Sequence, residues 1–140
     1  MSTFLIIEED GNLFSKIAHL ITSVDSKAEF LHYRNIDNLK NLHSKAEDNS
    51  TQFDFAIIDC SNKTEKNLEQ DSHFIKHKFR ADPILIITAF DNFEISLNTL
   101  KQLGIFTVLH KPFDELITKE LLILALTSKK LYIPRELKSQ

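Results

Sequence analysis

The chain has 140 residues, 42% of them hydrophobic and 26% charged, and this balance is typical of one globular domain. A formal charge of −3 excludes a general basic surface for nucleic acid or anionic membranes, and the apolar runs are far shorter than the roughly 20 residues of a membrane span. A single cysteine excludes an internal disulfide framework, which fits a reducing compartment, and only two glycines argue against a glycine-rich phosphate loop.

Apolar runs and helical spacings alternate along the first third of the chain. Residues 4–7 predict a buried strand, and apolar side chains at helical spacing predict a helix over 12–24, with its first residue as the N-cap. A weaker apolar pattern at 28–34 predicts a strand near an edge of the sheet. Apolar side chains at helical spacing then predict a second helix over 36–42. The polar residues 44–52 predict a surface loop.

The middle of the chain repeats this alternation. Residues 53–59 predict a strand that ends in a carboxylate, and residues 60–71 are polar. A helix is expected around residues 74–79, and Pro83 breaks it before a clearly buried strand at 84–88.

The last third contains two further helices and one strand. Apolar spacing predicts a helix over 93–103 that Gly104 ends, and then a strand over 106–110. The last helix is expected over 115–130, with Asp114 as its N-cap.

Strand and helix alternate five times, which predicts an α/β fold built on a five-stranded parallel sheet. No internal repeat or linker divides the chain. We therefore expect one domain over residues 1–130, followed over 131–140 by a C-terminal tail or the start of a linker.

Polar side chains interrupt the apolar pattern where the predicted strands end. In open α/β sheets, ligands bind at the carboxyl ends of the strands, so these residues are expected to meet at one edge. They are Glu8, Glu9, Asp10, Asp59, Thr88 and Lys111.

These residue types are the ones that transfer of a phosphoryl group to a carboxylate requires. Asp59 is expected to be the nucleophile that forms an acyl phosphate. Glu8, Glu9 and Asp59 offer the hard oxygen ligands that Mg²⁺ prefers. Thr88 is expected to donate a hydrogen bond to a phosphoryl oxygen, and Lys111 to place a cation on another.

Four short segments carry a resemblance to a known family. They are FLIIEED, FDFAIID, ILIITAF and VLHKPF, they occur in this order at strand ends, and they extend over residues 4–130. The pattern resembles the receiver domain of bacterial two-component response regulators. The resemblance implies a doubly wound, flavodoxin-like sheet with strand order 2-1-3-4-5.

The resemblance also implies a function. Asp59 would accept a phosphoryl group from a histidine kinase or phosphotransfer protein with Mg²⁺, and the backbone carbonyl of Ser61 would complete the metal site. The Lys111–Pro112 peptide bond would be cis. Such a domain is a phosphoacceptor rather than an enzyme, apart from its own phosphorylation and dephosphorylation.

The sequence departs from the family pattern at three places. Glu9 stands where the family has aspartate, and neither the usual Met-Pro pair nor the glycine that comes after it follows Asp59. Val108 replaces the aromatic residue that couples to Thr88 in the family.

These departures keep an alternative open, in which the chain is a pseudo-receiver that binds a partner without phosphorylation. A small flavodoxin-like or phosphatase-like enzyme is a third interpretation. The absence of a phosphate loop after the first predicted strand argues against it.

The last predicted helix indicates an interaction surface, because residues 121–126 are apolar on more than one face. In the family, the fourth helix, fifth strand and fifth helix form a dimer or effector face, so a homodimer through these elements is an expectation. We expect a cytoplasmic domain that contacts neither membrane nor nucleic acid directly.

Two features away from the strand ends leave alternatives open. His73 and His77 have the spacing of a helical metal pair, and a solvated helix face is the alternative. Cys60 beside Asp59 could sense oxidants, but the neighbouring carboxylates oppose a thiolate, so we expect an inert thiol.

Overall fold

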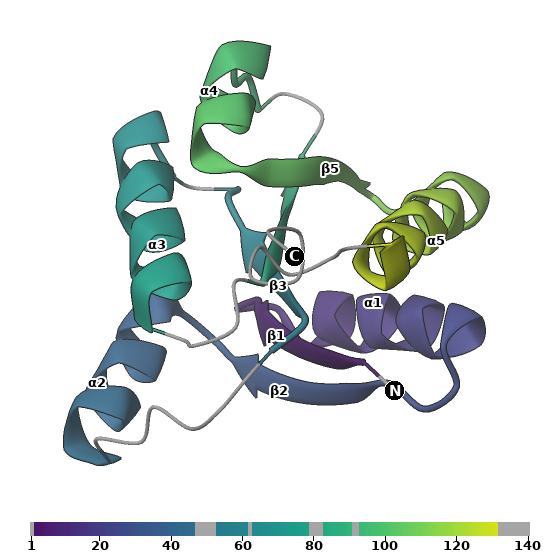
Figure 1. Ribbon diagram of the computed structural model, residues 1–140, viewed down its shortest axis with the longest axis horizontal. Coiled ribbons are helices and arrows are strands. Elements are labelled where there is room, and N and C mark those ends of the chain that lie inside the picture. Colours follow the sequence, from purple (N-terminus) through teal and green to yellow (C-terminus); the bar gives the residue numbers. More distant parts are fainter. Residues whose placement is uncertain (1, 47–52, 62, 79–82, 91–92, 132–140) are drawn as a thin grey trace, which may run out of the picture.

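The computed structural model describes residues 2–46, 53–61, 63–78, 83–90 and 93–131. It contains a five-stranded, all-parallel sheet in the order β2-β1-β3-β4-β5, as the resemblance predicted (Figure 1). The strands are β1 Thr3–Ile7, β2 Glu29–Tyr33, β3 Phe55–Asp59, β4 Ile84–Phe90 and β5 Ile105–Lys111. The helices are α1 Gly11–Val24, α2 Ile36–Ala46, α3 Glu65–Lys78, α4 Leu97–Leu103 and α5 Glu115–Leu131.

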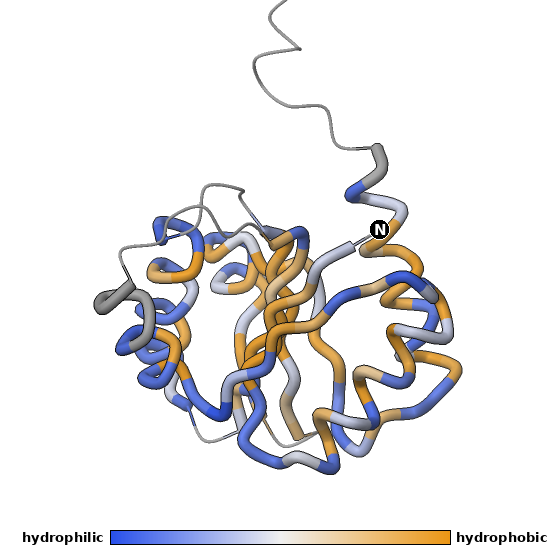
Figure 2. Tube along the Cα trace, turned by 90° about the horizontal axis from the view of Figure 1, so that it is seen from below, coloured by the Kyte–Doolittle hydropathy of each residue, from blue (hydrophilic) through white to orange (hydrophobic). Residues whose placement is uncertain are grey.

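Helices cover both faces of the sheet, which is why the central strands carry apolar side chains on both faces over most of their length. Residues of α1 and α5 pack with one set of strand side chains, and residues of α2, α3 and α4 pack with the other set. On β3, Ile57 belongs to the first cluster and its neighbour Ile58 to the second. Figure 2 shows hydrophobic residues along the strands in the centre, with hydrophilic segments towards the periphery.

Helix α3 begins earlier than the sequence predicted. It starts at Glu65, within the polar segment 60–71, and only two of its first eleven residues, Leu68 and Ile75, are buried aliphatics. The backbone N–H of Asn67 donates to Thr64 Oγ1 at 3.1 Å, and the N–H of Thr64 donates back to Asn67 Oδ1 at 3.4 Å. This reciprocal cap starts the helix where the apolar period is too weak to reveal it.

The other helix ends differ from prediction by a few residues. Helix α1 is capped by Asp10 rather than Asn12, since Asp10 Oδ1 accepts from the N–H of Asn12 at 2.8 Å. Helix α4 begins at Leu97, capped by Ser96, four residues after the predicted start. Helix α2 continues to Ala46 into the predicted surface loop, while residues 47–52 of that loop lie outside the described residues.

Several local predictions are confirmed. Gly104 ends α4 with a φ of 70°, and Asp114 Oδ1 accepts from the N–H of Ile117 at 2.9 Å in the first turn of α5. The Lys111–Pro112 peptide bond is cis.

The predicted tail lies almost wholly at residues 132–140, outside the described residues. Within those that are described, no helix combines the length and apolar character of a membrane span.

Candidate functional site

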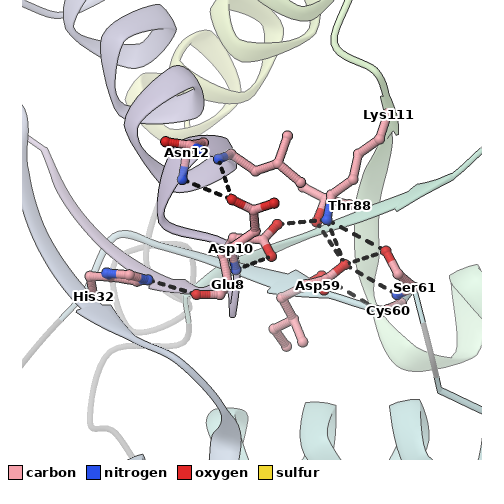
Figure 3. Close-up of polar contacts among 11 residues, drawn as sticks. Glu8, Asp10, Asn12, His32, Asp59, Cys60, Ser61, Thr88 and Lys111 are labelled. Carbon is pink, nitrogen blue, oxygen red and sulfur yellow. Dashed lines mark hydrogen bonds and ion pairs between the residues drawn. The ribbon is translucent and has the colours of Figure 1, made fainter.

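The predicted site residues gather at the carboxyl edge of the sheet. Glu8 follows β1, Asp59 ends β3, Thr88 lies on β4 and Lys111 ends β5, so four adjacent strands each contribute one side chain (Figure 3). Asp59 and Thr88 are direct partners in the β3–β4 register. The arrangement follows from the parallel topology, because all strand ends of one polarity meet at the same edge.

Lys111 lies at the centre of this site. Its Nζ donates to Glu8 Oε1 at 2.6 Å and to Asp59 Oδ1 at 2.9 Å, and it lies 3.4 Å from Ser61 Oγ. Only 2% of Lys111 is exposed, and its ammonium also lies 5.4 Å from the centre of the Phe90 ring. A buried cation therefore joins carboxylates from β1 and β3, which would otherwise repel each other.

Asp59 uses only one of its two carboxylate oxygens. Oδ1 accepts from Ser61 N–H at 3.1 Å, Ser61 Oγ at 2.7 Å, Thr88 Oγ1 at 3.5 Å and Lys111 Nζ at 2.9 Å. Among the described residues, no hydrogen bond or ion pair reaches Oδ2. The protein thus orients the carboxylate through Oδ1 and leaves Oδ2 available to an incoming group.

The surroundings keep both members of the central ion pair charged. Burial alone would raise the pKa of Asp59, but the hydrogen bonds from Ser61 and Lys111 and the charge of Lys111 lower it below its usual value. Burial alone would lower the pKa of Lys111, but its bonds to Glu8 and Asp59 and their charges raise it above its usual value. Asp59 is therefore an anion and Lys111 a cation at neutral pH.

The acidic residues after β1 separate into different environments. Glu8 is buried, and its Oε2 accepts from the N–H of Asp10 at 3.1 Å. Glu9 is exposed, and Asp10 is occupied as the cap of α1. Over the described ranges, no three His, Cys, Asp or Glu side chains form a group suited to hold a metal ion. The structure therefore brings Glu8 and Asp59 together through Lys111 but does not gather Glu9 with them.

Sequence reasoning missed several contacts that support the site. His32 of β2 places Nε2 2.7 Å from the carbonyl oxygen of Glu8, and its ring stacks on Phe14 of α1 at 3.9 Å. Lys63 forms an ion pair with the buried Asp71 of α3, beside the segment that carries Ser61. A histidine within an apolar strand was the available signal for the first contact.

The other residues that the sequence singled out have their side chains outside this group of site residues. Cys60 is fully buried, and burial raises the pKa of its thiol to about 12, as expected of an inert thiol. Val108 is half-buried against the core on the α3 and α4 face. The rings of His73 and His77 lie 4.1 Å apart on the exposed surface of α3.

No family model and no curated protein sequence matches the chain. Its structure is similar to a response regulator receiver protein from Burkholderia phymatum, with a TM-score of 0.67 and 16% identity over 91% of this chain and 96% of that one. It is also similar to a signal receiver domain of a two-component histidine kinase from Clostridium thermocellum, with a TM-score of 0.71 and 14% identity over 89% and 97%.

A response regulator from Thermotoga maritima gives a TM-score of 0.69 and 11% identity over 91% of this chain and 98% of that one. The chain has the receiver-domain fold. The predicted α/β class, strand order and likeness to receiver domains are therefore confirmed. At identities of 11–17% the likeness concerns the fold, and the chemistry of the receiver site rests on the residues described above.

Proposed function

We propose that this chain is a receiver domain that accepts a phosphoryl group on Asp59 from the phosphohistidine of a histidine kinase or phosphotransfer protein. The observation that carries the proposal is the carboxylate of Asp59, which Lys111, Ser61 and Thr88 hold through Oδ1 while Oδ2 remains available. A carboxylate held in this way is oriented for attack, and its nucleophilic oxygen is not engaged.

Each neighbour has a role in the proposed transfer. Asp59 Oδ2 attacks phosphorus, the O–P bond forms, the N–P bond of the phosphohistidine breaks, and its imidazole leaves. Lys111 places a positive charge beside the transferred group, and Thr88, one strand away, is in reach to donate to a phosphoryl oxygen. One phosphoryl group is held per molecule, so the domain acts as a phosphoacceptor rather than as a turnover enzyme.

The donor set fits Mg²⁺, which binds proteins through one or two carboxylates and keeps several waters. Glu8 and Asp59, which the ends of β1 and β3 bring together, would hold the ion with the backbone carbonyl of Ser61, whereas Glu9 is exposed outside this group. When bound, Mg²⁺ neutralises charge on the carboxylates and phosphoryl oxygens. We further propose that the phosphorylated state changes the surface formed by α4, β5 and α5, and that the domain works in the cytoplasm.

The direct test is the intact mass of the protein after incubation with acetyl phosphate and Mg²⁺. We expect one added phosphoryl group on the wild type, none on Asp59→Asn, and none on the wild type in EDTA. Leu97→Asn, a substitution at an exposed residue of α4, is the folded control and should be labelled like the wild type.

Two outcomes would contradict the proposal. Equal labelling of the wild type and Asp59→Asn would show that another residue carries the phosphoryl group. No labelling of either, under conditions that label an ordinary receiver, would favour the pseudo-receiver. The exposed Glu9 and the aliphatic Val108 are the features of this chain that fit that alternative.

A further inference from the structure

Two histidines of α3 lie side by side on the surface of this helix. His73 and His77 are both exposed, whereas Leu68 and Ile75 of the same helix are buried in the core between α3 and the sheet. A spacing of four residues separates the two histidines by about 6 Å along the helix axis and keeps them on one face. The histidine pair therefore belongs to the outward face of α3, and the proposed phosphoryl transfer does not use it.

The two imidazole rings are close enough to bind one ion together. Their centres lie 4.1 Å apart and their planes are inclined by 42°. Two imidazoles that bind one metal ion at about 2.0–2.1 Å have ring centres about 4.5–5 Å apart, so the rings need to separate by less than about 1 Å. Because both side chains are exposed, rotation of their own torsions can make this adjustment while the backbone stays in place.

The ring nitrogens of this pair are available to a ligand. Within the described ranges of the chain, no hydrogen bond or ion pair engages His73 or His77. His73 also borders a surface hollow of about 330 Å³, which leaves room for water molecules around a bound ion. The other residues that line this hollow are Lys66, Glu69 and Gln70.

The electrostatics of α3 are compatible with a bound cation. His77 belongs to the last turn of the helix, whose backbone carbonyl groups have no partner within the helix and carry partial negative charge. The exposed carboxylate of Glu69 lies one turn before His73. Lys76, which shares the last turn with His77, extends its ammonium to Gly104 at the end of α4.

Two imidazole nitrogens select a class of metal ion. Imidazole suits Zn²⁺, Ni²⁺ and Cu²⁺, whereas Mg²⁺ prefers hard oxygen ligands. We propose that His73 and His77 chelate one divalent transition-metal ion, with water in the remaining coordination positions. Such a two-ligand site agrees with the finding that no three ligand side chains are grouped in the described part of the chain. The proposal does not depend on phosphorylation of Asp59.

Isothermal titration calorimetry with Zn²⁺ tests the site, with the full chain freed of any affinity tag and in excess Mg²⁺. We expect one Zn²⁺ per chain, and we expect His73→Asn and His77→Asn each to weaken binding by about tenfold or more, because a single imidazole loses the chelate. His19→Asn is the matched control, since His19 is an exposed histidine of α1 with no second histidine four residues away. Asp59→Asn should also bind Zn²⁺ like the wild type, which separates this site from the proposed phosphoacceptor.

A rescue variant tests the spacing of the pair. In the His77→Asn background, Glu69→His places a second imidazole four residues from His73 and is expected to restore the wild-type affinity. Lys78→His in the same background places it five residues away, on another face of the helix, and is not expected to restore binding. Electron paramagnetic resonance of the Cu²⁺ form should show two coordinated nitrogens in the wild type and one in His77→Asn.

Circular dichroism spectra like that of the wild type would show that these surface variants are folded. A wild type that binds no Zn²⁺ would overturn the proposal, and so would equal restoration by Glu69→His and Lys78→His. Loss of binding in His19→Asn or Asp59→Asn, with none in His77→Asn, would place the ion elsewhere and reject this site.

Discussion

Lys111 decides the electrostatics of the candidate site, because its buried ammonium bonds to both Glu8 and Asp59. Removing one partner of a buried ion pair leaves the other charges without compensation, and this costs far more than the loss of a surface pair. The same residue is the cation proposed to stabilise the transferred phosphoryl group. Stability and the proposed function therefore both require a cation at this position, and removal of Lys111 is expected to impair both.

Lys111→Met is expected to lower the free energy of unfolding at pH 7 by about 3 kcal/mol, because two carboxylates then face each other without a cation. Urea denaturation would measure the loss. Lys119→Met, which removes an exposed pair with Glu115, is the control and should cost far less than Lys111→Met. Equal costs for the two variants would contradict the central role of Lys111.

The pH dependence of stability follows from the direction of the Asp59 shift. The pKa of Asp59 is lower in the folded protein than its ordinary value of about 3.9, so Asp59 stabilises the fold above that value. This contribution disappears as pH falls through the lower, folded pKa. The wild type should therefore lose stability between about pH 5 and pH 2 more steeply than Asp59→Asn. Parallel pH profiles of the unfolding free energy for the two proteins would contradict the shift.

The elements of the fold differ in how clearly the sequence pattern predicts them. The strands were predicted well, because both faces are covered and continuous apolar runs result. Helix α3 was predicted only over its second half, since its first turns present Thr64 and Asn67 as a cap and few apolar residues. Its buried Asp71 is paired with Lys63, so a charged residue occupies a position where an apolar one would have revealed the helix.

The two glycines provide a matched test of helix ends. Gly104 closes α4 with a φ of 70° and has the end of the Lys76 side chain close to its Cα hydrogen, so Gly104→Ala should destabilise the protein by about 1 kcal/mol. Gly11 begins α1 and a Cβ there meets nothing within 4 Å, so Gly11→Ala should stabilise by about 0.5 kcal/mol. Thermal unfolding would measure both, and a shift of the same sign in both variants would contradict this assignment.

The whole molecule has two cores that share one sheet. Adjacent residues of β3 face opposite layers, so neither core can lose its packing without disturbing the strand that holds the other. We therefore expect the fold to unfold as one cooperative unit, with the site at the end of β3 depending on both layers.

Ile57→Ala and Ile58→Ala test this cooperativity, one from each core. Both side chains are essentially fully buried, so each variant should lose about 2–5 kcal/mol, and each should still unfold in one transition. Far-ultraviolet circular dichroism, together with thiol reactivity of the buried Cys60 on the Ile58 side, would follow the transition. Separate midpoints for the two probes would show that the layers unfold independently.

Local pattern in the sequence was sufficient for the fold class, the strands and the residues at the strand ends. A continuous apolar run specifies a strand in an α/β fold, and parallel strands bring their carboxyl ends to one edge, so Glu8, Asp59, Thr88 and Lys111 could be grouped before any contact was known. The four motifs in order also led to the strand order and the cis peptide bond.

The directions in which the side chains point, and the contacts that they make, depend on the folded chain. The bond from Lys111 to Glu8 joins residues 103 positions apart, and no period in the sequence encodes which oxygen of Asp59 it engages. Glu8 and Glu9 are neighbours of the same type, yet the backbone turns one into the site and the other towards solvent. Pattern specifies which residues are apolar or charged, whereas the burial of each side chain depends on what packs against its element.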